Sequence, residues 1–206
     1  MFSERYGLEQ AVLAGTKTMT RRIIPDIEID WNRRGRVTLP VSGFEHGVLF
    51  MDVRSILHDA GICDYSAPAK YRPKYKVGEE VAIAQAYQTL RWPALPGIDW
   101  KTITDEVTHS KGWKNKMYVK AKYMPHRIRI TGFKVERMQD IREEDCLREG
   151  IKKMEEGVPY RFDENGKIHL SADPRMLFAD LIDRISGRGT WQSNPWVYAY
   201  EFELVR

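Results

Sequence analysis

Residues 196–204, with the sequence WVYAYEFEL, constrain the fold more than any other part of the chain. Large apolar side chains recur at every second position of this run: Trp196, Tyr198, Tyr200, Phe202 and Leu204. In a β-strand, alternate residues point to the same face of the sheet. An apolar face of this size has to be buried, so the run predicts a core strand.

A second long strand is predicted over residues 126–138, HRIRITGFKVERM. Ile128 and Ile130 share one parity, whereas Phe133 and Val135 share the other. Gly132 lies between the two pairs and marks a β-bulge, which resets the face that is buried.

Weaker patterns predict the remaining strands. Residues 79–87 predict a buried strand, because Val81, Ile83 and Gln85 alternate with small alanines. Residues 116–123 predict another strand. Residues 37–52 predict two short strands around a loop that contains glycines.

Three helices have recognisable ends. Residues 7–14 predict a short helix that Gly15 terminates. Residues 140–151 predict a helix with Asp140 as its N-cap and Gly150 at its end. The clearest helix follows Asp173, with Pro174 in its first position, Gly187 beyond its end and an apolar stripe made of Leu177, Phe178, Leu181, Ile182 and Ile185.

The order of these elements predicts an α+β fold, because strands dominate, helices are short and no β-α-β rhythm is present. We expect a small mixed β pseudo-barrel with peripheral short helices, built as one domain over residues 1–206. Long segments between the elements predict insertions near residues 26–74, 90–116 and 155–172. The second has no clear period, and the third predicts a hairpin around the turn sequence DENGK.

Composition narrows the class of protein. The chain has 206 residues, of which 42% are hydrophobic, and no apolar run approaches the roughly 20 residues of a membrane-spanning helix. The charged start MFSERYGLEQ and two distant cysteines, Cys63 and Cys146, predict a cytoplasmic protein without a membrane partner. The five histidines have no ligand spacing, so we expect no metal and no cofactor. A net charge of +4 is compatible with a polyanionic partner.

The stretch GTKTMTRR, residues 15–22, holds the candidate chemistry. Lys17, Arg21 and Arg22 gather three cations, and guanidinium groups match phosphate or carboxylate geometry. Thr18 and Thr20 add hydroxyls, which become nucleophiles only beside a base. A basic helix end, whose cations complement exposed carbonyl groups, is the alternative interpretation of the same residues.

The order of several blocks resembles the ASCH family of the PUA-like superfamily, in its larger bacterial and phage form. The blocks are the Gly15-x-Lys17-Thr18-x-Thr20 motif, then VGEEVAIAQAY, IREEDCLREGI and finally NPWVY. The resemblance implies an RNA-associated pseudo-barrel domain, and its partner is expected to be RNA or a modified nucleoside.

Some small ASCH proteins are amidohydrolases that remove the acyl group from acylated cytidine. The resemblance then implies Lys17, Thr20 and Glu149 as catalytic residues, with Thr20 attacking the amide carbonyl, Lys17 accepting its proton and Glu149 orienting the lysine. Gln85 stands where related members carry a carboxylate in the cavity.

The function that we expect is binding of RNA or a modified nucleoside in a pocket lined by lysine, threonine and arginine. The amidohydrolase is the alternative, and a ribonuclease is a weaker one. The candidate binding residues are Thr18, Arg21, Arg22, Gln85 and Trp191, the last as a stacking surface. The basic run KYRPKYK, residues 70–76, alternates cations with tyrosines and suits a strand-binding groove or a solvated loop.

Overall fold

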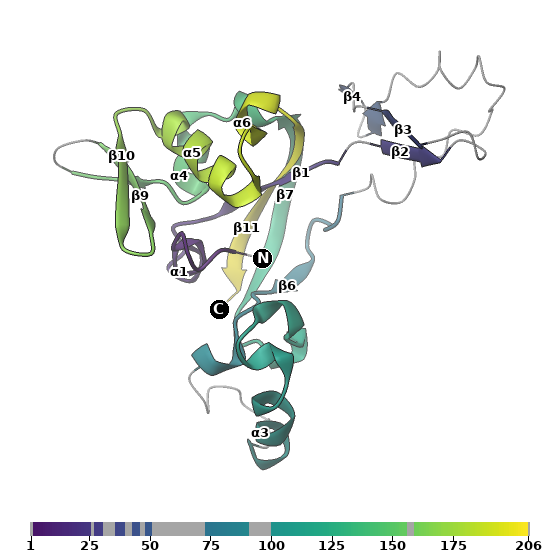
Figure 1. Ribbon diagram of the computed structural model, residues 1–206, viewed down its shortest axis with the longest axis vertical. Coiled ribbons are helices and arrows are strands. Elements are labelled where there is room, and N and C mark those ends of the chain that lie inside the picture. Colours follow the sequence, from purple (N-terminus) through teal and green to yellow (C-terminus); the bar gives the residue numbers. More distant parts are fainter. Residues whose placement is uncertain are drawn as a thin grey trace.

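The computed structural model of the chain describes residues 2–25, 27–30, 36–39, 43–45, 48–50, 73–90, 100–155 and 159–205. A curled antiparallel sheet of four strands, in the order β1-β11-β7-β6, lies at its centre (Figure 1). The strands are β1 (Met19–Ile23), β6 (Glu80–Ala82), β7 (Arg127–Arg137) and β11 (Trp196–Val205). The architecture is α+β, as the sequence predicts, and the sheet forms a half-barrel.

The long pair β7 and β11 forms the middle of the sheet. The predicted bulge is confirmed, because Glu201 pairs with Gly132 whereas Phe202 pairs with Ile130, which leaves Thr131 as the extra residue. The extra residue shifts the alternation of side chains along β7, so Ile130 and Phe133 point to the same face of the sheet. There they pair with Phe202 and Tyr200 of β11. The predicted core strand is therefore the second strand of the sheet, with neighbours on both sides.

Helices cover one end of the sheet (Figure 1). They are α1 (Leu8–Leu13), α4 (Glu143–Arg148), α5 (Pro174–Ser186) and α6 (Thr190–Ser193). The Asp173 side chain caps α5 by accepting from the backbone N–H of Arg175, as predicted. Of the predicted stripe, Ile185 is exposed while the other four residues are buried.

The start of α4 differs from the prediction. Asp140 does not cap this helix; its carboxylate accepts instead from the backbone N–H of Arg137 and closes a 3₁₀ turn, η6 (Met138–Asp140). The helix begins three residues later, at Glu143. Gly150 ends it with φ +112°, as predicted.

The hairpin predicted within residues 155–172 is confirmed. It consists of β9 (Tyr160–Glu164) and β10 (Lys167–Ser171), and β8 (Lys152–Lys153) pairs with β9. Asn165 and Gly166 form its turn with φ values of +47° and +85°. Two successive positive φ angles are what a tight hairpin turn requires.

A second lobe lies below the sheet in Figure 1 and contains α3 (Trp100–Thr108). Short 3₁₀ turns complete it: η2 (Tyr87–Thr89), η3 (Lys111–Trp113), η4 (Lys116–Tyr118) and η5 (Ala121–Tyr123). The strand predicted over residues 116–123 is wrong, since these residues form η4 and η5. Asn115 caps η4 and the Tyr87 hydroxyl accepts from the backbone N–H of Lys120, so local capping takes the place of strand pairing.

The predicted insertion near residues 26–74 contains two isolated hairpins within its described residues. β2 (Ile27–Asp30) pairs with β3 (Arg36–Leu39), and β4 (Gly43–Glu45) pairs with β5 (Val48–Phe50). Gly43 therefore belongs to a strand, where the sequence predicted a loop. Cys63 and residues 51–72, including the first part of the basic run, lie outside the described residues.

Candidate functional site

Strand β1 separates two environments by the alternation of its side chains. Met19 and Arg21 are buried on one face, whereas Thr20 and Arg22 are partly exposed on the other. Thr20 pairs with Tyr200 of β11, so both side chains point to the same face of the sheet. The motif of residues 15–22 thus supplies two different sites, one on each side of the strand.

Arg21 lies at the centre of a buried ion cluster. Its guanidinium contacts one carboxylate with two nitrogens, Nε at 3.0 Å and Nη2 at 2.5 Å from Glu136 Oε1. Nη2 is also 3.2 Å from Asp145 Oδ2, and Nη1 is 3.1 Å from Glu149 Oε1. Burial alone would lower the pKa of Arg21, but the three carboxylates raise it above its usual value.

Lys17 completes this cluster from the end of α1. Its Nζ donates to Glu149 Oε2 and to the Glu149 carbonyl oxygen, both at 2.6 Å. Burial lowers the pKa of Lys17, opposed by the attraction of Glu149. Lys134 adds a third cation, 2.9 Å from Asp145 Oδ2 and 3.0 Å from Glu136 Oε2. The buried ion cluster therefore joins β1, β7 and α4 with three cations and three carboxylates.

Asp145 has the least exposed side chain of the three carboxylates in this cluster, at 2%. Burial by itself would raise its pKa, but hydrogen bonds from Lys134 and Arg21 hold the pKa below its usual value. The carboxylate is therefore ionised and accepts hydrogen bonds from cationic partners, which is the condition for a stable buried charge.

A pocket of about 280 Å³ lies on the other face of β1, between the sheet and the second lobe. Thr20, Arg22 and Tyr200 contribute from the sheet, and Lys74 and Tyr75 from the segment before β6. Lys116, Met117, Val119, Ala121 and Met124 contribute from the second lobe. The remaining walls are apolar: Phe2, Val81, Ala82, Ile83, Ala84, Ile128 and Ile130.

The polar groups of the pocket are held in place. The Tyr200 hydroxyl accepts from the backbone N–H of Lys74 at 2.8 Å, and its ring packs edge-on against Tyr75 at 5.5 Å between centroids. Lys74 Nζ lies 5.3 Å from the centroid of Tyr75. Lys116 Nζ bonds to Glu9 Oε2 at 2.9 Å and to the Phe2 carbonyl oxygen at 2.6 Å.

The pocket combines cations with aromatic rings and carries no acidic side chain among its described lining residues. Such a site can hold a flat aromatic group against tyrosine and an anionic group against arginine and lysine. At about 280 Å³ it is close to the lower limit of roughly 300 Å³ for ligand pockets, which suits a small ligand.

The predicted catalytic residues are distributed between the two sites. Lys17 and Glu149 are hydrogen-bonded to each other in the buried ion cluster, while Thr20 lines the pocket. Phe2 is the link between them, since its ring lines the pocket and its centroid lies 6.0 Å from Lys17 Nζ.

The predicted binding residues also separate. Arg22 lines the pocket, whereas Arg21 is fully buried in the ion cluster and does not reach a pocket rim. The Thr18 hydroxyl accepts from Arg148 Nε at 3.2 Å, away from the pocket. Trp191 packs edge-on against Phe178 of α5 at 6.2 Å, which places it in the helical layer.

Gln85 is buried beside the pocket wall without lining it. Its Nε2 donates to Glu9 Oε1 at 3.1 Å, and Glu9 in turn holds Lys116. Its Oε1 has no hydrogen-bond partner among the described residues. Gln85 therefore positions Lys116 through Glu9.

Sequence reasoning missed several of these groups. The sequence predicts Tyr200 only as a core residue, although its pairing with Thr20 across the sheet puts it at the pocket. Lys116 lies at the end of a segment without hydrophobic periodicity, so the sequence does not indicate its role. Glu136 and Asp145 show no pattern other than their charge that would indicate a site. The run KYRPKYK did point to Lys74 and Tyr75.

Three further properties of the described residues complete the description. Within the described ranges, no group of three or more His, Cys, Asp or Glu side chains is placed to hold a metal ion. None of the helices in that part of the chain has the length and apolar character needed to cross a bilayer. Burial raises the pKa of the Cys146 thiol to about 12, so this thiol is unreactive.

Comparisons of this chain with protein families, with characterised proteins and with solved structures find no match.

Proposed function

We propose that the chain binds RNA or a modified nucleoside through the pocket between the sheet and the second lobe. The observation that supports this proposal most strongly is the pairing of tyrosine rings with cations in one pocket without an acidic side chain among its described lining residues. A base stacks on the partly exposed ring of Tyr75, and Arg22 and Lys74 hold the phosphate. The resemblance to ASCH domains is consistent with this ligand class.

The size of the pocket favours a pyrimidine, because its volume of about 280 Å³ leaves little room beyond one base and its sugar. Thr20 and the Tyr200 hydroxyl are then the groups that contact base edges, since hydroxyls both donate and accept. We propose a cytoplasmic setting, which agrees with the unreactive, buried thiol of Cys146.

Calorimetric titration with cytidine 5′-monophosphate tests this proposal. We expect binding that weakens about tenfold or more in Arg22→Gln, because a charged hydrogen bond contributes roughly 1.5–3 kcal/mol. Tyr75→Leu is expected to weaken cytidine and its monophosphate alike, because stacking contributes about 1–3 kcal/mol per base. Arg142→Gln is the matched control, as Arg142 is exposed at the residue before α4 and lies outside the pocket lining. Equal affinities in all four proteins would contradict the proposal.

The second candidate is an amidohydrolase that removes the acyl group from N-acylated cytidine. The observation that favours it is Lys17, whose pKa is lowered by burial as a lysine base requires. Thr20 supplies a hydroxyl at the pocket, and Glu149 holds the lysine. In this reaction Lys17 first gives up a proton to Glu149 and leaves the buried ion cluster for the pocket, since the two residues are hydrogen-bonded away from Thr20 here. The Thr20 oxygen then adds to the amide carbonyl carbon, and its proton passes through Lys17 to the nitrogen of cytidine, which leaves as the amine. Water hydrolyses the acyl-threonine ester that remains.

Incubation with N-acetylcytidine, followed by chromatography of cytidine and acetate, separates the two candidates. The hydrolase candidate requires cytidine release that is lost in Thr20→Val, a nearly isosteric change, and in Lys17→Met. Cytidine release that persists in Thr20→Val would exclude this nucleophile. Binding without turnover would leave the binding function alone, and cleavage of an RNA probe that depends on Lys17 would indicate the ribonuclease.

A further inference from the structure

The segment of residues 111–122, KGWKNKMYVKAK, has a charge pattern that the pocket alone does not use. It contains five lysines and no acidic residue. Lys116 lines the pocket, and its ammonium group is paired with Glu4 and Glu9 outside the pocket lining. The other four are exposed, and we call them the lysine strip: Lys111, Lys114, Lys120 and Lys122. Lys120 forms an ion pair with Glu106 of α3.

The backbone of this segment is fixed by packing in the second lobe. Gly112 is buried so close to Tyr87 that a Cβ at this position would lie 2.6 Å from the ring. The hydroxyl group of the same tyrosine, Tyr87, accepts a hydrogen bond from the backbone N–H of Lys120 at 2.8 Å. Since these contacts fix the chain at both ends of the segment, the lysines are presented from a preorganised surface.

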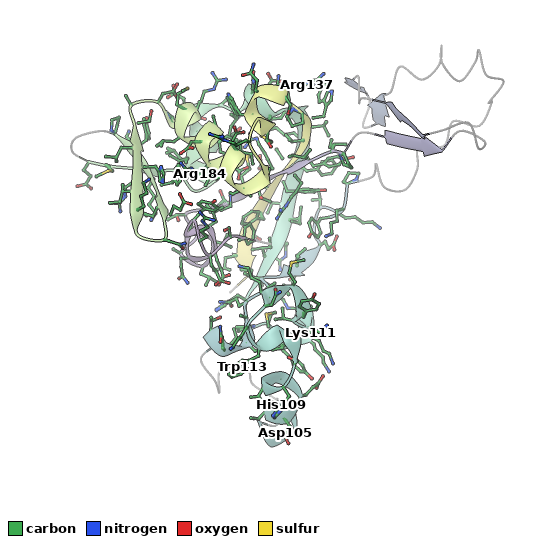
Figure 2. The ribbon with its side chains drawn as sticks, in the orientation of Figure 1. Asp105, His109, Lys111, Trp113, Arg137 and Arg184 are labelled. Carbon is green, nitrogen blue, oxygen red and sulfur yellow. The ribbon has the colours of Figure 1, made fainter. Side chains whose placement is uncertain are left out.

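Aromatic and apolar side chains accompany the strip at the surface. Met117 is 68% exposed and Tyr118 is 56% exposed. Lys111 Nζ lies 5.6 Å from the centroid of the exposed Tyr118, and Lys122 Nζ lies 4.6 Å from that of Tyr123, whose ring is buried in the lobe. Figure 2 shows Lys111 and Trp113 between the sheet and the tip of the lobe, where Asp105 lies. Cations beside exposed aromatic rings are the usual components of a surface for single-stranded nucleic acid.

The segment that carries the strip also lines the pocket, through Lys116, Met117, Val119 and Ala121. Resting on the proposed function, we propose that the partner is a single-stranded polynucleotide of several nucleotides. One base enters the pocket, and the phosphates that follow it lie on Lys111, Lys114 and Lys122. The chain thus binds a polymer more tightly than a single nucleotide. The exposed Tyr118 stacks on a base outside the pocket.

Fluorescence anisotropy with a labelled single-stranded RNA of about 12 nucleotides tests this inference. The variant carries Lys111→Ala, Lys114→Ala and Lys122→Ala together. Its matched control carries Lys152→Ala, Lys153→Ala and Lys167→Ala on β8 and β10, at the other end of the molecule (Figure 1). Both triple variants remove three exposed lysines, and their thermal unfolding is compared with that of the unsubstituted chain.

We expect RNA affinity at low salt to fall about tenfold or more in the strip variant and less than about twofold in the control. Each phosphate contact contributes about 0.7 to the slope of log affinity against log salt, so the slope should decrease by about 2. Binding of cytidine 5′-monophosphate should stay unchanged in the strip variant.

Equal loss of RNA affinity in both triple variants, or no loss in either, would overturn the inference while leaving the pocket intact. Binding to phosphatidylserine vesicles in place of RNA, lost in the strip variant, would overturn it in favour of a membrane surface. RNA binding that depends on the strip without any binding of cytidine 5′-monophosphate would support the strip and contradict the proposed function of the pocket.

Discussion

Arg21 and Arg22 are neighbours in the chain with opposite surroundings. Because a strand alternates its faces, Arg21 enters the buried ion cluster and Arg22 lines the pocket. Lys17, Arg21 and Glu149 therefore stabilise the junction of β1 with α4, and the ligand-binding role falls to Arg22. A guanidinium bonded to three carboxylates has no remaining capacity for an anionic ligand.

Glu149→Gln tests the role of the buried ion cluster. Removing this charge leaves the Lys17 ammonium buried beside a neutral amide, so we expect the free energy of unfolding to fall by about 3–5 kcal/mol. Urea denaturation followed by circular dichroism measures the change.

Glu201→Gln provides the control for this measurement, because the Glu201 carboxylate is 40% exposed and pairs with Arg148 at the surface. An exposed pair contributes at most about 1 kcal/mol. If both variants lose the same free energy of unfolding, the buried ion cluster does not stabilise the fold more than a surface ion pair does. Adding Lys17→Met to Glu149→Gln should recover part of the loss, since it removes the uncompensated charge.

At the scale of elements, the sequence predicts those structures whose signals are local. The helix after Asp173 and the hairpin at Asn165-Gly166 are both found where caps and turn residues place them. The bulge at Gly132 follows from a change of parity within one strand.

Elements that depend on distant partners could not be predicted in this way. Residues 116–123 alternate like a strand but pair with no strand in the described part of the chain, and Tyr87 and Asn115 hold them in 3₁₀ turns. Helix α3 lies in a segment of β-branched residues with low helix propensity, where packing of Val107 against the second lobe decides the outcome. Tertiary contacts override local preference at both places.

Gly150→Ala tests how α4 is joined to α1. Gly150 has φ +112°, and a Cβ at this position would lie 2.8 Å from Leu8 Cδ2. We expect a loss of about 1–3 kcal/mol in the free energy of unfolding, because both backbone strain and overpacking act against the side chain.

Gly132→Ala is the matched control, since the nearest atom to its Cβ is Glu201 Oε2 at 4.0 Å. We expect a change within about 0.5 kcal/mol for this variant. Chemical denaturation of both proteins gives the comparison, and equal stabilities would show that Gly150 is not required by its surroundings.

At the scale of the whole molecule, the pocket belongs to neither half alone. The sheet with its helices has one hydrophobic core, and the second lobe has a smaller one around Tyr87, Val107, Tyr123 and Met124. Thr20 and Tyr200 come from the first, and Lys116 and Met117 from the second. From the sequence, Thr20 and Arg22 could be predicted as site residues through their motif. The groups opposite them could not, because only the packing of the two parts brings them together.

Backbone amide chemical-shift mapping with cytidine 5′-monophosphate tests the central claim most directly, because it locates the ligand without a substitution. The account predicts shifts that gather at Thr20, Arg22, Ala84, Tyr200 and Lys116 and weaken towards Asp145 and Glu149. Shifts centred on Trp191 or on the β9–β10 hairpin, or no shifts when ligand is in large excess, would contradict it.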